Sequence, residues 1–126
     1  MSPKIPRPMA TQSISIELKC NCGPVIITVS IVNNAVFEVF VRFGKAGGCG
    51  SAMADGIATL ISYGLRSGLS PEDAVKALFG ISCHLGPETC MNVIAKAIRY
   101  VLKHLETGAD INDIIFDDET AEANAH

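Results

Sequence analysis

Apolar and polar residues alternate along the first third of the chain, with the period of half-buried β-strands. In residues 13–18, SISIEL, the apolar residues Ile14, Ile16 and Leu18 share one face. After the KCNCGP break, residues 25–32 are rich in β-branched side chains. They end at Asn33-Asn34, a pair that tolerates the positive φ angles of a tight hairpin. Two strands are therefore predicted.

Residues 35–43, AVFEVFVRF, predict a third strand. Their alternation puts one set on a common face, Phe37, Val39, Val41 and Phe43, and the other set on the opposite face, Val36, Glu38, Phe40 and Arg42. Three consecutive strands joined by short turns favour an antiparallel meander.

The apolar period then changes to three and four residues, which indicates helices. Residues 53–65 predict a first helix, and residues 89–105 predict a third one, closed by Gly108. Between them, Ser70 and Pro71 precede an acidic pair, a strong start signal for a second helix. We therefore predict an α+β fold: an N-terminal antiparallel β-meander of three strands, followed by three helices packed on one face.

Three segments are predicted along the chain. Residues 1–12 carry three prolines without periodicity and are expected to be a flexible arm. Residues 13–108 hold the predicted domain. Residues 109–126 are an acidic tail with one apolar cluster, at residues 114–116, which is expected to dock as a short strand or on a neighbouring molecule.

Composition narrows the classes of function. The 126 residues are 48% hydrophobic, enough for one domain and favourable to self-association. The net charge of -3 argues against binding to a nucleic-acid polymer or an anionic membrane. Every apolar run is shorter than the roughly 20 residues that span a bilayer, and the start does not resemble a signal peptide. We expect a cytoplasmic protein.

The glycine-rich stretch GKAGGCGSA, residues 44–52, joins the last strand to the first helix. Helix N-termini after such loops can hold anions. However, a P-loop needs its lysine at the end, whereas Lys45 comes near the start, and a dinucleotide pattern counted from Gly48 would need glycine at Met53. Spacing favours a packing turn, while Arg42 and Lys45 keep anion binding open.

The five cysteines cannot all pair within one chain, so free thiols or a metal are expected. Four thiolates would satisfy zinc, but paired C-x2-C knuckles are missing from the sequence, which favours small buried cysteines over a zinc site. A reactive thiol is a further option, because Cys49 and Cys90 lie at predicted helix N-termini. The zinc alternative would draw on Cys20, Cys22, Cys49, Cys83 and Cys90.

Polar residues gather before and within the third helix. Capping is the expected role of Thr89, whereas helix propensity explains Asn92 poorly and favours a binding role there. His84 has no apparent catalytic partner in the sequence. Phe79 is either a core residue or a ring that stacks on a base.

The motifs FEVFVRFGKAGGCGSA and LISYGLRSGLSPEDAVKALFGI, with Cys90 further on, resemble the TSCPD domain over residues 13–105. The signature that names this family falls on residues 88–92, where only the cysteine is retained. That domain occurs at the C-terminal end of adenosylcobalamin-dependent class II ribonucleotide reductases and as small free-standing proteins. The resemblance implies an accessory role, because the reductase's catalytic domain is not in this sequence.

The chain is also similar, in size and element order alone, to phage proteins that sequester cyclic nucleotide immune signals, the anti-Thoeris and anti-CBASS sponges. We therefore expect a non-enzymatic, homo-oligomeric module that captures a phosphorylated nucleotide-like small molecule without a cofactor. The alternatives are an accessory domain or subunit of a class II ribonucleotide reductase, and a zinc-stabilised structural domain. The residues expected to bind the ligand are Arg42, Lys45, Gly47, Gly48, Phe79, His84, Thr89, Asn92, Lys96 and Arg99.

Overall fold

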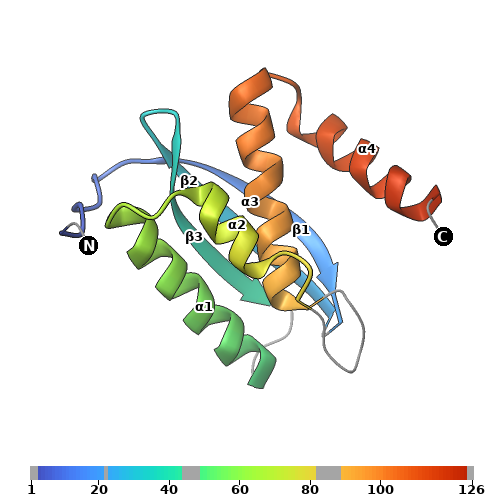
Figure 1. Ribbon diagram of the computed structural model, residues 1–126, viewed down its shortest axis with the longest axis horizontal. Helices are drawn as coiled ribbons and strands as arrows, with labels where there is room; N and C mark the ends of the chain where they lie inside the picture. The colour runs from blue at the N-terminus through green and yellow to red at the C-terminus, as the bar shows by residue number, and fades with distance from the viewer. Residues whose placement is uncertain (1–2, 22, 44–48, 82–88, 125–126) are drawn as a thin grey trace.

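A three-stranded antiparallel sheet with helices packed against it forms the body of the protein (Figure 1). The computed structural model describes residues 3–21, 23–43, 49–81 and 89–124. The strands are β1 (Gln12–Cys20), β2 (Gly23–Val32) and β3 (Ala35–Phe43), in the order β1-β2-β3. The predicted meander and the α+β class are confirmed.

The β2–β3 hairpin turns at Asn33 and Asn34, whose φ angles are 52° and 62°. Next to this turn the pairing of β2 with β3 shifts by one residue: Ile31 pairs with Val36, whereas Ser30 pairs with Glu38. The extra residue between them is a β-bulge. Because of it, Val36 joins Val39 in the buried core and Phe37 does not, so the prediction that grouped Phe37 with Val39, and Val36 with the opposite face, was wrong.

The helices are α1 (Cys49–Arg66), α2 (Pro71–Leu78), α3 (Cys90–Thr107) and α4 (Ile111–Asn124). Ser70 caps α2, accepting a hydrogen bond from the backbone N–H of Asp73 at 3.1 Å. Gly108 ends α3 in the left-handed conformation, with φ 75°. Both boundaries agree with the signals in the sequence.

The core lies between α3 and the sheet, which α3 crosses (Figure 1). Ile27 and Val29 of β2 are fully buried, as are Ile94, Ile98 and Val101 of α3. Burial of such side chains contributes about 1.5–3 kcal/mol each. This contact fixes the position of α3 against the middle of the sheet.

Helix α1 lies along β3 (Figure 1). The Ser62 hydroxyl accepts a hydrogen bond from the Val39 N–H and donates one to the Val39 carbonyl, both at 2.8 Å. β3 is an edge strand of the sheet, so within the described part of the chain no further strand pairs with these backbone groups. Ser62 therefore satisfies part of the free edge and holds α1 against it.

The acidic tail forms a fourth helix, α4, so the prediction of three helices was wrong. Ile111, Ile114 and Ile115 recur at helical spacing and pack against the core. The Asp110 carboxylate accepts a hydrogen bond from the Asn112 N–H at 2.8 Å, as an N-terminal cap does. Within the described residues, none of the helices combines the length and the apolarity that crossing a membrane requires.

Candidate functional site

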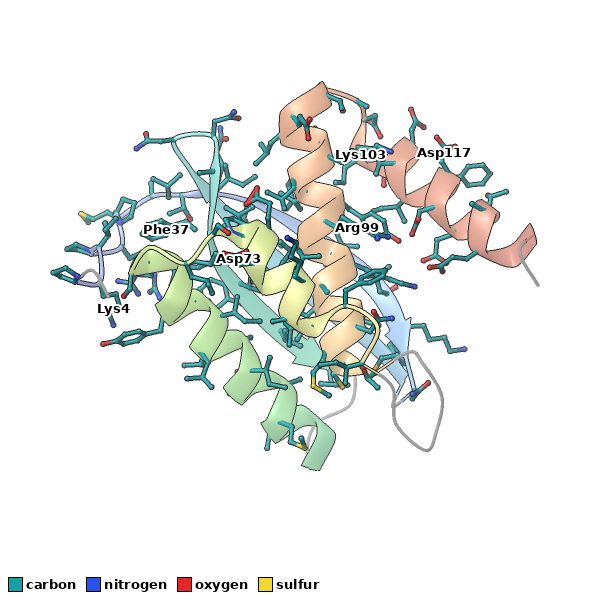
Figure 2. The ribbon with its side chains drawn as sticks, viewed as in Figure 1. Lys4, Phe37, Asp73, Arg99, Lys103 and Asp117 are labelled. Carbon is teal, nitrogen blue, oxygen red and sulfur yellow. The ribbon has the colours of Figure 1, made fainter. Side chains whose placement is uncertain are left out.

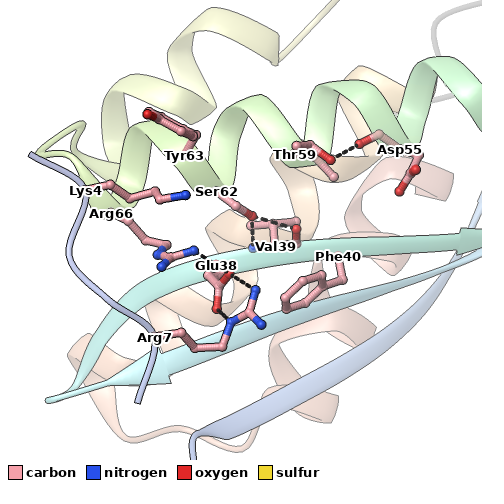
Figure 3. Close-up of a pocket in the computed structure, with 11 residues that line it drawn as sticks. Lys4, Arg7, Glu38, Val39, Phe40, Asp55, Thr59, Ser62, Tyr63 and Arg66 are labelled. Carbon is pink, nitrogen blue, oxygen red and sulfur yellow. Dashed lines mark hydrogen bonds and ion pairs between the residues drawn. The ribbon is translucent and has the colours of Figure 1, made fainter. Parts of the chain in front are cut away.

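A cavity of about 200 Å³ opens between the N-terminal arm, β3 and α1 (Figure 3). Three cationic side chains line it, Lys4 and Arg7 from the arm and Arg66 from the last turn of α1. Two aromatic side chains, Phe40 of β3 and Tyr63 of α1, complete the rim together with polar groups of α1. The folded chain thus brings three positive charges, from segments far apart in the sequence, to one cavity.

The centre of this cavity is Glu38, which is 1% exposed. Its neighbour Val39 faces the core, so Glu38 points to the opposite face of the sheet. The Arg7 guanidinium donates two hydrogen bonds to the carboxylate, Nε to Oε1 at 2.7 Å and Nη2 to Oε2 at 2.8 Å. Arg66 Nη1 lies 3.5 Å from Oε2. A buried carboxylate needs such partners, and here two guanidiniums supply them.

The arm that carries two of these cations is attached to the end of α1. The Ile5 N–H donates to the Arg66 carbonyl at 2.8 Å, and Arg66 Nε donates to the Ile5 carbonyl at 2.9 Å. The hydrogen bonds and the charge of Glu38 raise the pKa of Arg7. Arg66 therefore positions both the arm and the buried carboxylate.

The aromatic rings of the rim lie beside the cations of the arm. Lys4 Nζ is 4.6 Å from the centroid of the Tyr63 ring, and Arg7 Cζ is 5.7 Å from that of Phe40. Both distances are within the range of cation–π attraction. Tyr63 and Phe40 are 51% and 44% exposed, so each ring also offers apolar surface to a ligand.

This arrangement fits a small anion. Three positive side chains face two negative ones, Glu38 and Asp55, which leaves the lining positive overall. Each guanidinium has five N–H donors, so Glu38 does not exhaust those of Arg7. The volume is below the roughly 300–1,000 Å³ of pockets for drug-sized ligands, so it suits a phosphate group with part of a sugar.

The residues predicted for ligand binding lie elsewhere. Among those that the structure describes, none lines this cavity. Arg42 is exposed on β3, while Lys45, Gly47, Gly48 and His84 lie outside the described residues.

The structure brings most of the other predicted residues together around the first half of α3. Thr89 caps α3, accepting from the Asn92 N–H at 3.1 Å, as the sequence predicted. The Asn92 side chain accepts from the Gly80 N–H at 2.7 Å and so connects α3 to the end of α2. The Arg99 guanidinium lies 4.5 Å from the centroid of the Phe79 ring, and Figure 2 shows Arg99 on the side of α3 that faces α4.

Two of the five cysteines are described fully. Cys20 Sγ of β1 lies 3.9 Å from Cys90 Sγ at the start of α3. Cys22 and Cys83 lie outside the described residues, and for Cys49 the structure describes the backbone alone. Within the described ranges, His, Cys, Asp and Glu form no group of three that could hold a metal.

Sequence reasoning missed the cavity because it treated the arm as separate from the domain. A signal in the sequence was Glu38, which with Arg42 is one of two charged residues in a strand that is otherwise apolar. Its burial implies a cation. Nothing in the local sequence identifies Arg7, 31 positions away, as that cation.

A model of the TSCPD domain family matches residues 1–102. The matched segment includes the arm, the sheet, α1, α2 and most of α3, and it ends before α4. No match to the chain was found among curated proteins or among solved structures.

Proposed function

This chain belongs to the TSCPD domain family, and we propose that it is a non-enzymatic module that captures a small phosphorylated, nucleotide-like ligand. The observation that carries the proposal is the convergence of Lys4, Arg7 and Arg66 on one cavity beside two exposed aromatic rings. Capture of this kind requires complementary charge and a stacking surface, and no bond is made or broken.

The geometry suggests how the ligand lies. The phosphate group contacts the free N–H donors of Arg7 and the ammonium of Lys4, with Arg66 behind them. A cavity of about 200 Å³ does not hold a whole nucleotide, so the base remains outside, against Phe40 or Tyr63. Stacking on such a ring contributes about 1–3 kcal/mol per base.

Calorimetry at low salt with AMP, ADP and a cyclic dinucleotide tests this proposal. Lys4 is the best position to change, because its side chain is exposed and lies over the Tyr63 ring without forming part of the core. We expect Lys4→Ala to weaken binding about fivefold, the worth of one exposed charge contact of about 1 kcal/mol. Lys19→Ala, an equally exposed lysine on β1, is the matched control.

Arg42→Ala separates this cavity from the glycine-loop site that the sequence suggested. If the cavity is the site, Arg42→Ala leaves the affinity unchanged. A loss of affinity in Arg42→Ala but not in Lys4→Ala would place the ligand at the glycine loop. Tightest binding of the cyclic dinucleotide would support the narrower role of sequestering cyclic nucleotide signals.

We also propose that the protein is a homo-oligomer assembled through α1. Met53 and Leu60 lie on the outward side of this helix and are 59% and 75% exposed. A helix face of this kind pairs with the same face of a second copy about a two-fold axis. Light scattering after size exclusion should show a dimer that Leu60→Glu dissociates and that Phe116→Glu, on α4, does not. A wild-type monomer at every concentration contradicts this.

A second candidate function, an accessory subunit of a class II ribonucleotide reductase, is favoured by the adjacent thiols of Cys20 and Cys90. Such a subunit would either reduce a disulfide of its partner by thiol–disulfide exchange, with Cys20 and Cys90 becoming the new disulfide, or bind the partner directly. Co-purification with the reductase, lost in a Cys90→Ser variant, would support this function. Failure to co-purify under reducing and oxidising conditions would exclude it.

A further inference from the structure

The side of α3 that faces α4 carries three hydrogen-bond donors within one turn, Lys96, Arg99 and Tyr100. Two carboxylates of α4 meet them. Lys96 Nζ lies 2.8 Å from Glu122 Oε1 and 3.0 Å from Oε2. Arg99 Nη2 lies 3.6 Å from Asp118 Oδ1, and the Tyr100 hydroxyl donates to Asp118 Oδ2 at 2.5 Å.

The two carboxylates lie one helical turn apart on α4. Asp118 and Glu122 are four residues apart, so they lie on one side of α4 with about 5–6 Å between their Cβ atoms. The donors at positions 96, 99 and 100 share the corresponding side of α3. Lys96 is only 4% exposed, and burial of an ammonium group requires an anion beside it.

Among the described side chains of α4, those that pack against the apolar core lie in its first half. Among the α4 side chains whose burial the structure describes, Ile114 alone is buried. Beyond it, Phe116 is largely exposed, and the carboxylates of Asp118 and Glu122 connect this part of α4 to α3. The family match ends at Leu102, so α4 is an addition to the matched unit that covers its cations.

We propose that Lys96, Arg99 and Tyr100 form a second anion-binding face, which takes a small phosphorylated molecule and which α4 occupies with its own carboxylates. The ligand displaces the second half of α4. A small ligand fits better than a long acidic segment, because all three donors lie within one helical turn. The Phe79 ring, stacked on Arg99, extends this face toward α2. The face is separate from the cavity at Lys4 and Arg7.

The test uses the full chain and inorganic pyrophosphate as the probe. Asp118→Asn/Glu122→Gln removes the resident carboxylate charges. Asp113→Asn/Asp117→Asn removes the same charge from exposed positions of the same helix, one of them labelled in Figure 2. We expect the first variant to bind pyrophosphate about tenfold more tightly than wild type, the effect of losing two partly exposed ion pairs. The second variant should bind like wild type.

Two further variants locate the gained binding. Adding Arg99→Ala to Asp118→Asn/Glu122→Gln should abolish the gain, whereas adding Lys4→Ala should preserve it. If Lys4→Ala abolishes the gain instead, the pyrophosphate binds in the cavity and the second face is refuted while the proposed function stands. An equal gain in the Asp113/Asp117 variant would also overturn the proposal, because the effect would then be one of net charge.

A measurement on the wild-type protein keeps the test independent of how well the variants fold. Pyrophosphate at saturating concentration should accelerate amide hydrogen exchange in residues 116–122, since ligand and helix compete for the same donors. Exchange in residues 94–101 of α3 should not accelerate. Unchanged exchange in α4, with pyrophosphate bound, would refute the competition.

Discussion

Replacing Glu38 with Gln is the sharpest test of the cavity, because stability and affinity should change in opposite directions. The change keeps the shape of a side chain that is 1% exposed. It replaces one carboxylate oxygen with an NH2 group that faces a guanidinium and cannot accept its hydrogen bond. An unsatisfied buried polar group costs about 1–3 kcal/mol, and we expect about 2 kcal/mol, since Arg7 can turn toward water.

Urea denaturation followed by circular dichroism measures this cost, which corresponds to about 6–10 °C in the thermal midpoint. Affinity should change the other way. Removing one negative charge beside a bound phosphate group is worth at least about 1 kcal/mol, so nucleotide binding should tighten about fivefold.

Glu17→Gln is the matched control, an exposed glutamate on β1 that should change stability by less than about 0.5 kcal/mol and affinity little. If Glu38→Gln lowers stability and affinity together, the carboxylate is a structural partner of Arg7 and Arg66 and the cavity does not bind anions.

Three further changes test individual contacts. Ser62→Ala leaves the edge of β3 unsatisfied and should cost about 1–3 kcal/mol in chemical denaturation, whereas Ser62→Thr, which keeps the hydroxyl, should cost less. Burial and the hydrogen bond to Asp118 raise the pKa of Tyr100. The protonated hydroxyl therefore stabilises the fold below about pH 10, and this contribution is lost as the pH rises further. Absorbance of the tyrosinate should show that Asp118→Asn lowers the pKa of Tyr100. Gly64→Ala would place a Cβ 2.9 Å from Leu69 Cδ2, and because Leu69 is 39% exposed and can move aside while alanine favours the helix, calorimetric melting should reveal a net change within about 1 kcal/mol.

Local signals were sufficient to predict most of the fold. Each element that the sequence defines by its own period and caps is present, including the hairpin at Asn33-Asn34 and the cap at Ser70. Two predictions about single elements were wrong, each for a physical reason. The bulge near Phe37 breaks strict alternation, and its position depends on pairing with β2. The helix α4 was missed because its charge suggested a tail, although Ile111, Ile114 and Ile115 follow a helical period.

The cavity was beyond the reach of local signals, because its cations come from segments that meet only in the folded chain. Arg7 and Glu38 are 31 positions apart, and Arg66 joins them from the end of α1. Arg99 and Lys96 were predicted as ligand-binding cations from their side of α3, but the carboxylates that meet them lie in the segment expected to be a tail. Charge patterns along a sequence indicate available groups, and tertiary pairing decides their partners.

A buried carboxylate at the centre of an anion site is consistent with binding, because it positions the guanidiniums as well as opposing the ligand. Arg7 has a long side chain with several rotatable bonds, and its two hydrogen bonds to Glu38 hold the guanidinium in one orientation. Fixing it before the ligand arrives reduces the entropy lost on binding. Glutamine at this position retains one acceptor oxygen and therefore part of this positioning, while it removes the opposing charge. Alanine would remove both, so its effect on affinity would mix two contributions of opposite sign.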